Sequence, residues 1–206
     1  MGYFLLFNWL TEAGARVAIY LSSNNLPLLH FYTLGEFVLL SFFYRTLFPQ
    51  HGFFRKYFVV ILTTVSLLIV LNTIFLQSIY AFNSYAKTLV QIILIIYAIV
   101  YFFHLPEAPS FQKSESWYRA PLDQMNPGGM SNFRKHEGWS LRLINSAVLI
   151  YYCGSLFIFM FSNVFIQKSV IYHSFWIFNA LLNFLFQVLV LLGLWRVAFR
   201  RPKLSF

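Results

Sequence analysis

Charged side chains are scarce in this sequence. Only 10% of its 206 residues are charged, whereas 59% are hydrophobic and 21% are aromatic. Soluble domains of this size carry about a quarter charged residues, and one globular core could not hide so many apolar side chains. The scarcity of charge therefore excludes an ordinary soluble domain and predicts that lipid is the main solvent of the chain.

Cysteine is almost absent too. Cys153 is the only one and lies in an apolar run, which excludes a disulfide framework and a cysteine-based metal site. The five histidines are scattered, and no set of them has the helical spacing of metal ligands. The segment NPGGMS (126–131) lacks the lysine of a phosphate-binding loop, and no serine-nucleophile elbow occurs. No cofactor and no metal are predicted.

The sequence is nevertheless basic, with 15 Lys and Arg against 6 Asp and Glu and a formal net charge of +9. The basic residues stand between apolar runs rather than on one face of a soluble fold. This pattern is typical of membrane topology and argues against a nucleic-acid partner.

Long apolar runs divide the chain into segments that suit membrane-spanning helices of about 20 residues. They predict six helices, at about 3–22, 28–48, 57–77, 87–104, 141–162 and 174–197. Glu12 and Arg16 interrupt the first of these runs. The runs lack the short alternating pattern of barrel strands. We therefore expect an all-α, polytopic helical bundle in which residues 1–206 form a single transmembrane domain.

The basic residues also predict the orientation of this bundle. With a cytoplasmic N-terminus, twelve of the 15 fall in the cytoplasmic connections and the tail. Lys87 and Lys168 would lie on the opposite side, and Arg16 inside the first helix. The positive-inside rule thus favours cytoplasmic termini, N-in and C-in. If the first helix does not span, the N-terminus moves outside and the other assignments stand.

The segment 105–140 is the only sizeable part expected outside the membrane. Four prolines and a Gly128–Gly129 pair indicate an irregular cytoplasmic loop rather than a domain. It is either a plain connection or a docking segment for a separate cytoplasmic signalling partner. Membrane lipids are the other expected partners, and a homo-oligomer is possible.

Ionisable residues inside a membrane are costly and so are candidates for function. Glu12 and Arg16 stand four residues apart, in the favourable order for an intrahelical ion pair. Such a pair would either join helices or contribute to a site.

The second predicted helix holds three further candidates. Tyr32 and Glu36 share a face, so that the phenol can hydrogen-bond the carboxyl. Glu36 must either pair with a cation, for which Arg16 is the natural candidate, or stay protonated. His30 lies on another face near the outer end of the helix. It is either an interface histidine or a ligand contact.

The last predicted helix carries an amide stripe. Asn179, Asn183 and Gln187 recur every four residues, a spacing typical of contacts between membrane helices. In the N-in topology, Asn179 and Asn183 fall at the same depth as Glu12, Arg16, His30, Tyr32 and Glu36. This depth predicts a polar cluster that opens toward the outside.

Two runs carry a resemblance. NNLPLLHFYTLGEF (24–37) and INSAVLIYYCGSLFIF (144–159) resemble uncharacterised multipass proteins of bacterial inner membranes with sensor-like helical bundles. The resemblance covers two of the predicted helices and implies no activity.

Three functions remain open at this point. The leading hypothesis is a non-enzymatic sensory or ligand-binding module with an outward-facing polar pocket, since polar residues gather at outer depth and catalytic motifs are lacking. The first alternative is a small transporter or oligomeric channel subunit that uses Glu36 as an ion or proton site. The second is a lipid-modifying enzyme that uses His30 with Glu36 or Glu12.

Overall fold

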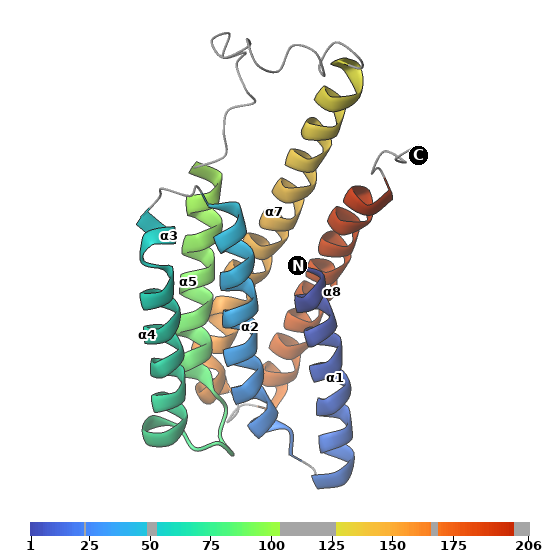
Figure 1. Ribbon diagram of the computed structural model, residues 1–206. Helices are drawn as coiled ribbons and strands as arrows, with labels where there is room; N and C mark the ends of the chain where they lie inside the picture. Colours follow the sequence, from blue (N-terminus) through green and yellow to red (C-terminus); the bar gives the residue numbers. More distant parts are fainter. Residues whose placement is uncertain (23, 49–52, 104–126, 166–168, 200–206) are drawn as a thin grey trace.

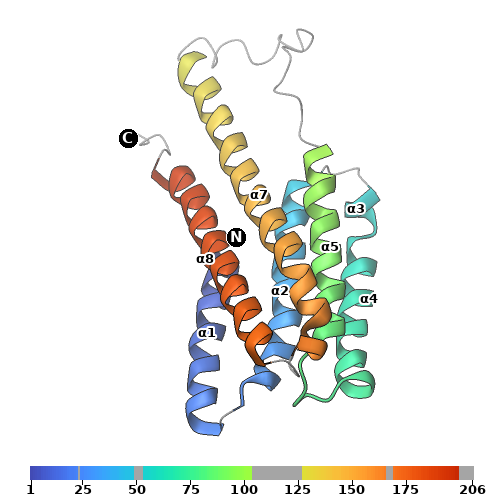
Figure 2. The same cartoon turned by 180° about the vertical axis from the view of Figure 1, so that it is seen from behind.

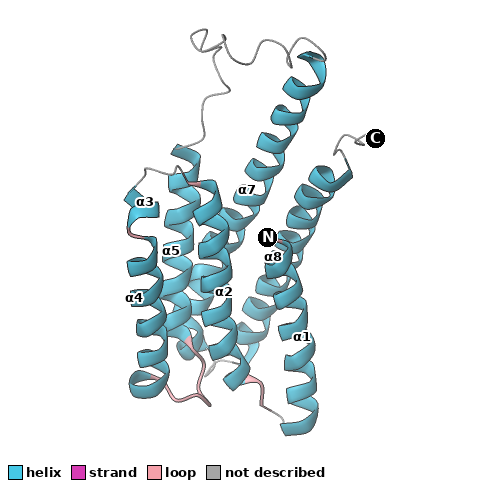
Figure 3. Cartoon of the chain, in the orientation of Figure 1, coloured by secondary structure: helices cyan, strands magenta, loops and turns pink. Residues whose placement is uncertain are grey.

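The computed structural model describes the chain except for residues 23, 49–52, 104–126, 166–168 and 200–206. Within the described part every regular element is a helix (Figure 3), which confirms the all-α prediction. The helices are α1 (Gly2–Ser22), α2 (Leu26–Leu47), α3 (Phe53–Lys56), α4 (Phe58–Leu71), the π-helix η1 (Asn72–Leu76), α5 (Ser84–Phe103), α7 (Pro127–Phe165) and α8 (Ser169–Phe199).

Five of these helical segments are long and apolar enough to cross a membrane: Leu26–Leu47, Phe58–Leu76, Ser84–Phe103, Gly138–Ser162 and His173–Arg196. In the spans of α4 and α8 only 17% of the residues are buried inside the protein, against 50% in α7. Apolar faces exposed to this extent on a protein call for lipid or a partner to cover them. The helix α1 is not among the five, so the sixth predicted span stays a prediction.

The helices begin and end close to the predicted positions, with one clear exception. The segment 105–140 was expected to be an irregular loop, but α7 already begins at Pro127. Proline is favoured in the first turn of a helix, where its missing N–H has no partner to lose. The loop prediction is therefore wrong for 127–140, and the part from 105 to 126 lies outside the described residues.

The helices form one bundle with α1 and α4 at opposite edges (Figures 1 and 2). Helices α2, α4 and α5 lie side by side, α7 packs along α5 and α8, and α1 contacts α2. The helix α1 is displaced along the bundle and reaches lower than its neighbours in Figure 1. The α1–α2 turn and the η1–α5 connection lie at this lower end, which is the end nearest the polar residues described below.

Glycines allow α7 and α8 to approach closely. A Cβ added at Gly193 of α8 would lie 2.6 Å from Ile144 Cγ1 of α7. In return, a Cβ at Gly154 of α7 would lie 2.8 Å from Leu182 Cδ1 of α8. Small residues at such contacts are typical of packed membrane helices. This interface fixes the position of the residues that α7 and α8 contribute to the site.

A buried amide joins three helices near the other end of the bundle. Asn145 of α7 accepts a hydrogen bond from the Tyr44 hydroxyl of α2 at 2.7 Å and donates to the Ala98 carbonyl of α5 at 3.0 Å. Both side-chain functions of this fully buried asparagine are thus satisfied. Asn145 therefore links helices rather than binding a ligand.

Candidate functional site

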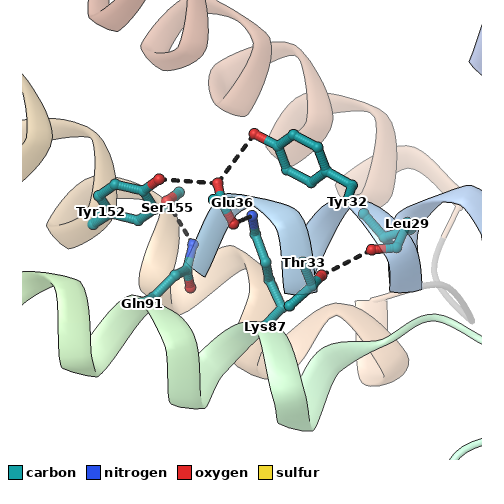
Figure 4. A network of polar contacts seen from close by, with 8 residues as sticks. All are labelled: Leu29, Tyr32, Thr33, Glu36, Lys87, Gln91, Tyr152 and Ser155. Atoms are coloured by element: carbon teal, nitrogen blue, oxygen red, sulfur yellow. Dashed lines mark hydrogen bonds and ion pairs between the residues drawn. The ribbon is translucent and has the colours of Figure 1, made fainter. Parts of the chain in front are cut away.

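The centre of the candidate site is a buried ion pair between α2 and α5. Lys87 Nζ donates to Glu36 Oε2 at 2.5 Å, and the two side chains are 1% and 0% exposed. The other carboxylate oxygen, Oε1, accepts hydrogen bonds from the Tyr32 hydroxyl at 3.0 Å and the Tyr152 hydroxyl at 2.9 Å. Figure 4 shows these groups converging on Glu36 from three helices. The fully buried carboxylate is thus hydrogen-bonded at both oxygens, as a buried charge requires.

Aromatic rings surround the ammonium group of this pair. Lys87 Nζ lies 4.7 Å from the ring centre of Tyr32 and 5.2 Å from that of Phe159. Both distances suit cation–π attraction. Gln91, one turn further along α5, donates to the Ser155 hydroxyl of α7 at 2.8 Å and ties α5 to α7 beside the pair (Figure 4).

The connection between η1 and α5 positions Lys87 in the first turn of α5. Asn72 Nδ2 donates to Gln77 Oε1 at 3.2 Å and to Asn83 Oδ1 at 3.0 Å, while Gln77 Nε2 donates to Ser84 Oγ at 3.0 Å. These buried amides fix the entry into α5. A π-turn inside a membrane helix often marks a functional region, and here it brings Asn72 into this cluster.

His30 belongs to this connection and not to the ion pair. Its Nδ1 lies 2.9 Å from Thr73 Oγ1, and its Nε2 lies 3.2 Å from the Ala81 carbonyl oxygen. Because a carbonyl only accepts, Nε2 carries a proton. Both ring nitrogens of His30 are engaged with the η1–α5 region, whereas Glu36 points to α5 and α7. The sequence spacing predicted that the two side chains point in different directions, and these partners agree with it.

A cavity of about 230 Å³ lies next to the ion pair. The helix α1 lines it with one face, made of Asn8, Thr11, Glu12 and Ala15, whose spacing of three and four residues is that of a helical stripe. The helix α8 contributes Trp176, Asn179 and Asn183. Lys87, Tyr32, Tyr151 and Phe159 form the wall toward the ion pair. The cavity thus joins groups from five helices.

Two amide groups of the cavity lack hydrogen-bond partners among the described residues. Asn8 is 2% exposed, and its Nδ2 is buried without an acceptor. Asn179 Oδ1 is buried without a donor. Since nearly all buried polar groups in proteins find a partner, these two are candidates for contact with a ligand.

The predicted cation partner of Glu36 was wrong. Arg16 was expected to pair with Glu36 or with Glu12, but Lys87 holds Glu36. Arg16 is exposed and does not line the cavity. Glu12 instead accepts a hydrogen bond from Asn183 Nδ2 of α8 at 3.4 Å. The reason is that α1 stands at the edge of the bundle (Figures 1 and 2), where both Glu12 and Arg16 are exposed, whereas Glu36 is fully buried between α2, α5 and α7.

The other predicted residues divide between the cavity and its surroundings. Glu12, Tyr32, Asn179 and Asn183 line the cavity, whereas Gln187 and His30 do not. Tyr32 bonds Glu36 as its spacing predicts. The sequence did not indicate that Asn8 lines the cavity, that Tyr152 bonds Glu36 or that Lys87 is fully buried. The helical spacing could have indicated Asn8, because it lies one turn before Thr11, Glu12 and Ala15 on the same face of the helix.

The histidine and acidic candidates of the site do not come together. Within the described residues no group of three or more His, Cys, Asp or Glu side chains could hold a metal ion. His30, the base of the predicted lipid-enzyme alternative, is held on Thr73 and Ala81. No His–carboxylate pair therefore forms among these candidates.

The fold and the site together define a helical protein with five helices that are long and apolar enough to cross a membrane, and with a small polar cavity among its helices. Comparisons with protein-family models, with curated proteins and with solved structures found no match.

Proposed function

We propose that this chain is a multipass protein of the cell membrane that binds a small polar ligand in this cavity and acts as a non-enzymatic sensory or ligand-binding module. The supporting observation is the pair of buried amide groups without partners, Asn8 Nδ2 and Asn179 Oδ1, in a cavity of about 230 Å³. Small-molecule sites combine apolar walls with a few such convergent polar groups.

In the proposed topology six helices span the membrane, both termini are cytoplasmic and the cavity opens outward. Support comes from the end of the bundle opposite the α1–α2 turn (Figure 1), where α3, with Arg55 and Lys56, and the last turn of α8, with Arg196, lie. The guanidinium of Arg196 lies 4.1 Å from the ring centre of Trp139. Tryptophan and arginine of this kind anchor helices at the cytoplasmic membrane interface.

A bound ligand would be reported to a separate cytoplasmic protein. Ligand contacts on α1 and α8 would shift these helices relative to the ion-paired core of α2, α5 and α7. The output would leave through the segment 105–140 or the C-terminal tail, which connect to α7 and α8. A ligand shifts such an equilibrium only by its differential affinity for the two arrangements, so contacts with both sides of the cavity are required.

The test is a screen of small polar solutes by thermal unfolding of the purified full-length protein in a non-ionic detergent. The variant Ala15→Phe fills the cavity, because Ala15 lines it. Ala13→Phe is the matched control, since Ala13 is exposed and does not line the cavity. At least one solute should raise the Tm of the wild type and of Ala13→Phe but not of Ala15→Phe. A screen without such a solute would refute the proposal.

A second candidate is a transporter in which Glu36 takes part in ion or proton coupling. The observation in its favour is that Lys87 both pairs with Glu36 and lines the cavity, so a ligand could disturb the pair. Solute flux into proteoliposomes that is lost in Glu36→Gln but kept in Glu36→Asp would support it. A ligand-binding module without transport would show no flux in any variant.

A further inference from the structure

The lining of the cavity has two formal charges, on Lys87 and Glu12, and they do not pair with each other. Lys87 is already neutralised by Glu36, at 2.5 Å, and its ammonium is covered by the rings of Tyr32 and Phe159. Glu12 is the other acidic group, and its described contact is the neutral amide of Asn183 at 3.4 Å. Glu12, which is exposed, is therefore the lining charge without an ion pair among the described residues. A cation would be attracted to it, and an anion would be repelled.

Most of the cavity groups that lack a full set of hydrogen bonds are acceptors, which suits a ligand with a cationic donor group. Glu12 and Asn179 Oδ1 accept hydrogen bonds, and both side chains belong to the lining. An ammonium group supplies up to three N–H donors for such acceptors. The one open donor, Asn8 Nδ2, requires an acceptor on the ligand, such as a hydroxyl or a carbonyl oxygen.

The remaining wall is aromatic. Trp176, Phe159 and Tyr151 line the cavity, and the rings of Trp176 and Phe159 meet edge to face, with centres 5.8 Å apart. Aromatic faces attract cations and also cover apolar groups. The same wall thus accommodates both the positive end and the hydrophobic body of one ligand.

We infer that the ligand of this cavity is a small organic ammonium compound, with an apolar body and a neighbouring hydrogen-bond acceptor. This inference rests on the proposed function, namely that the cavity binds a ligand. Glu12 and Asn179 hold the ammonium, Asn8 donates to the acceptor, and the aromatic wall covers the apolar body. The same chemistry is present in a free amino alcohol and in a phosphatidylethanolamine headgroup with its chains.

The experiment compares four matched probes by isothermal titration with the full-length protein in dodecyl maltoside. Phenylalaninol carries ammonium, hydroxyl and phenyl groups. In 3-phenylpropane-1,2-diol a hydroxyl replaces the ammonium. In phenyllactate a hydroxyl replaces the ammonium and a carboxylate replaces the hydroxymethyl group, and 2-phenylethylamine lacks the hydroxymethyl group. We expect phenylalaninol to bind at least tenfold more tightly than the diol, which corresponds to about 1.4 kcal/mol, and phenyllactate to bind least.

Variants assign each part of the preference to a residue. Glu12→Gln should remove most of the difference between phenylalaninol and the diol. Lys56→Gln, which removes a charge in α3 outside the lining, should leave that difference unchanged. Asn8→Leu should weaken phenylalaninol but not 2-phenylethylamine, because only the former has a hydroxyl for Asn8 Nδ2. Circular dichroism and gel filtration of each variant check that it is folded.

A competition between phenylalaninol and lipids distinguishes a lipid headgroup from a free amine as the ligand. Phosphatidylethanolamine that displaces phenylalaninol, where phosphatidylglycerol does not, supports a lipid headgroup as the occupant. Phenylalaninol binding that neither lipid displaces supports a free amine. Both results agree with ammonium recognition.

Two results would overturn the inference. If the diol or phenyllactate binds as tightly as phenylalaninol, and Ala15→Phe blocks it, the cavity binds ligands but does not select ammonium. If none of the four probes binds, ammonium recognition is also wrong. The solute screen with Ala15→Phe and Ala13→Phe then decides separately whether the cavity binds anything.

Discussion

Lys87 and Glu36 form a buried ion pair between the first turn of α5 and the middle of α2. Their closest atoms, Nζ and Oε2, lie 2.5 Å apart, and neither side chain is more than 1% exposed. Replacing a pair of this kind by apolar residues is often neutral or stabilising, whereas breaking it is costly. A pair that stability alone does not require, next to a cavity with open amide groups, points to function.

The first prediction concerns the free energy of unfolding of variants of this pair. Glu36→Gln and Lys87→Met should each cost about 3–5 kcal/mol, because each leaves one buried group without its partner. The double variant should cost clearly less than the sum, since no charge is then left unpaired. Unfolding by SDS in mixed micelles measures these values. Costs that simply add, within about 0.5 kcal/mol, would show that the two residues do not interact.

The second prediction separates two neighbouring tyrosines. The Tyr152 hydroxyl donates to Glu36 Oε1 at 2.9 Å, so Tyr152→Phe should cost about 1.5–3 kcal/mol, the range of hydrogen bonds to charged groups. Tyr151→Phe is the matched control, because the Tyr151 ring lines the cavity while its hydroxyl is not part of the bonds to Glu36. The same SDS titration compares the two. Equal losses for both variants would contradict the assigned hydrogen bond.

The third prediction is that Asn145 has a purely structural role. Asn145→Leu loses the bonds to the Tyr44 hydroxyl and the Ala98 carbonyl and should cost about 1–2 kcal/mol, the upper range for such contacts between membrane helices. Tyr44→Phe removes only one of the two bonds and should cost less. Phenylalaninol affinity should stay at the wild-type value in both, since neither residue lines the cavity. A selective loss of affinity would show that Asn145 acts on the site.

Much of the fold could be predicted because apolar runs of about 20 residues have few alternatives in a membrane. The structure has α2 at Leu26–Leu47, where 28–48 was predicted, and a hydrogen bond from Leu26 N to Asn24 Oδ1 precedes it. The start of α7 at Pro127 was missed. Proline and paired glycines are typical of loops, and the sequence pattern did not reveal that a long helix tolerates them at its first turn.

The site was predicted in part, and the reason lies in the difference between local and distant contacts. The Tyr32–Glu36 bond follows from spacing along one helix, so the sequence contained it. The Lys87–Glu36 pair joins residues 51 positions apart, and it depends on which helices are neighbours. Lys87 stands near the start of its helix, a position that suggests a lysine reaching for water. Instead the η1–α5 connection turns it into the bundle.

The fourth prediction tests the close approach of α7 and α8. Gly193→Val should destabilise the protein by about 1–3 kcal/mol, as overpacking does, because the new side chain would meet Ile144 and the Ser140 carbonyl oxygen. Gly138→Val is the control, since a Cβ at Gly138 meets nothing within 4 Å. Thermal unfolding in detergent distinguishes them. If both variants have the same Tm as the wild type, α8 does not pack on α7 at this point.

The last prediction concerns orientation, on which the outward opening of the cavity depends. Cys153→Ser provides a background without cysteine, because Cys153 is the only one. Tyr80→Cys and Lys56→Cys then introduce exposed thiols in the η1–α5 connection and in α3, at opposite ends of the bundle. In right-side-out membrane vesicles a membrane-impermeant maleimide should label position 80, and it should label position 56 only after lysis. The reverse pattern would turn the cavity toward the cytoplasm, so that its ligand would come from inside the cell. Gly2→Cys decides the sixth span in the same assay: labelling only after lysis means that α1 crosses the membrane, whereas labelling of intact vesicles means that it does not.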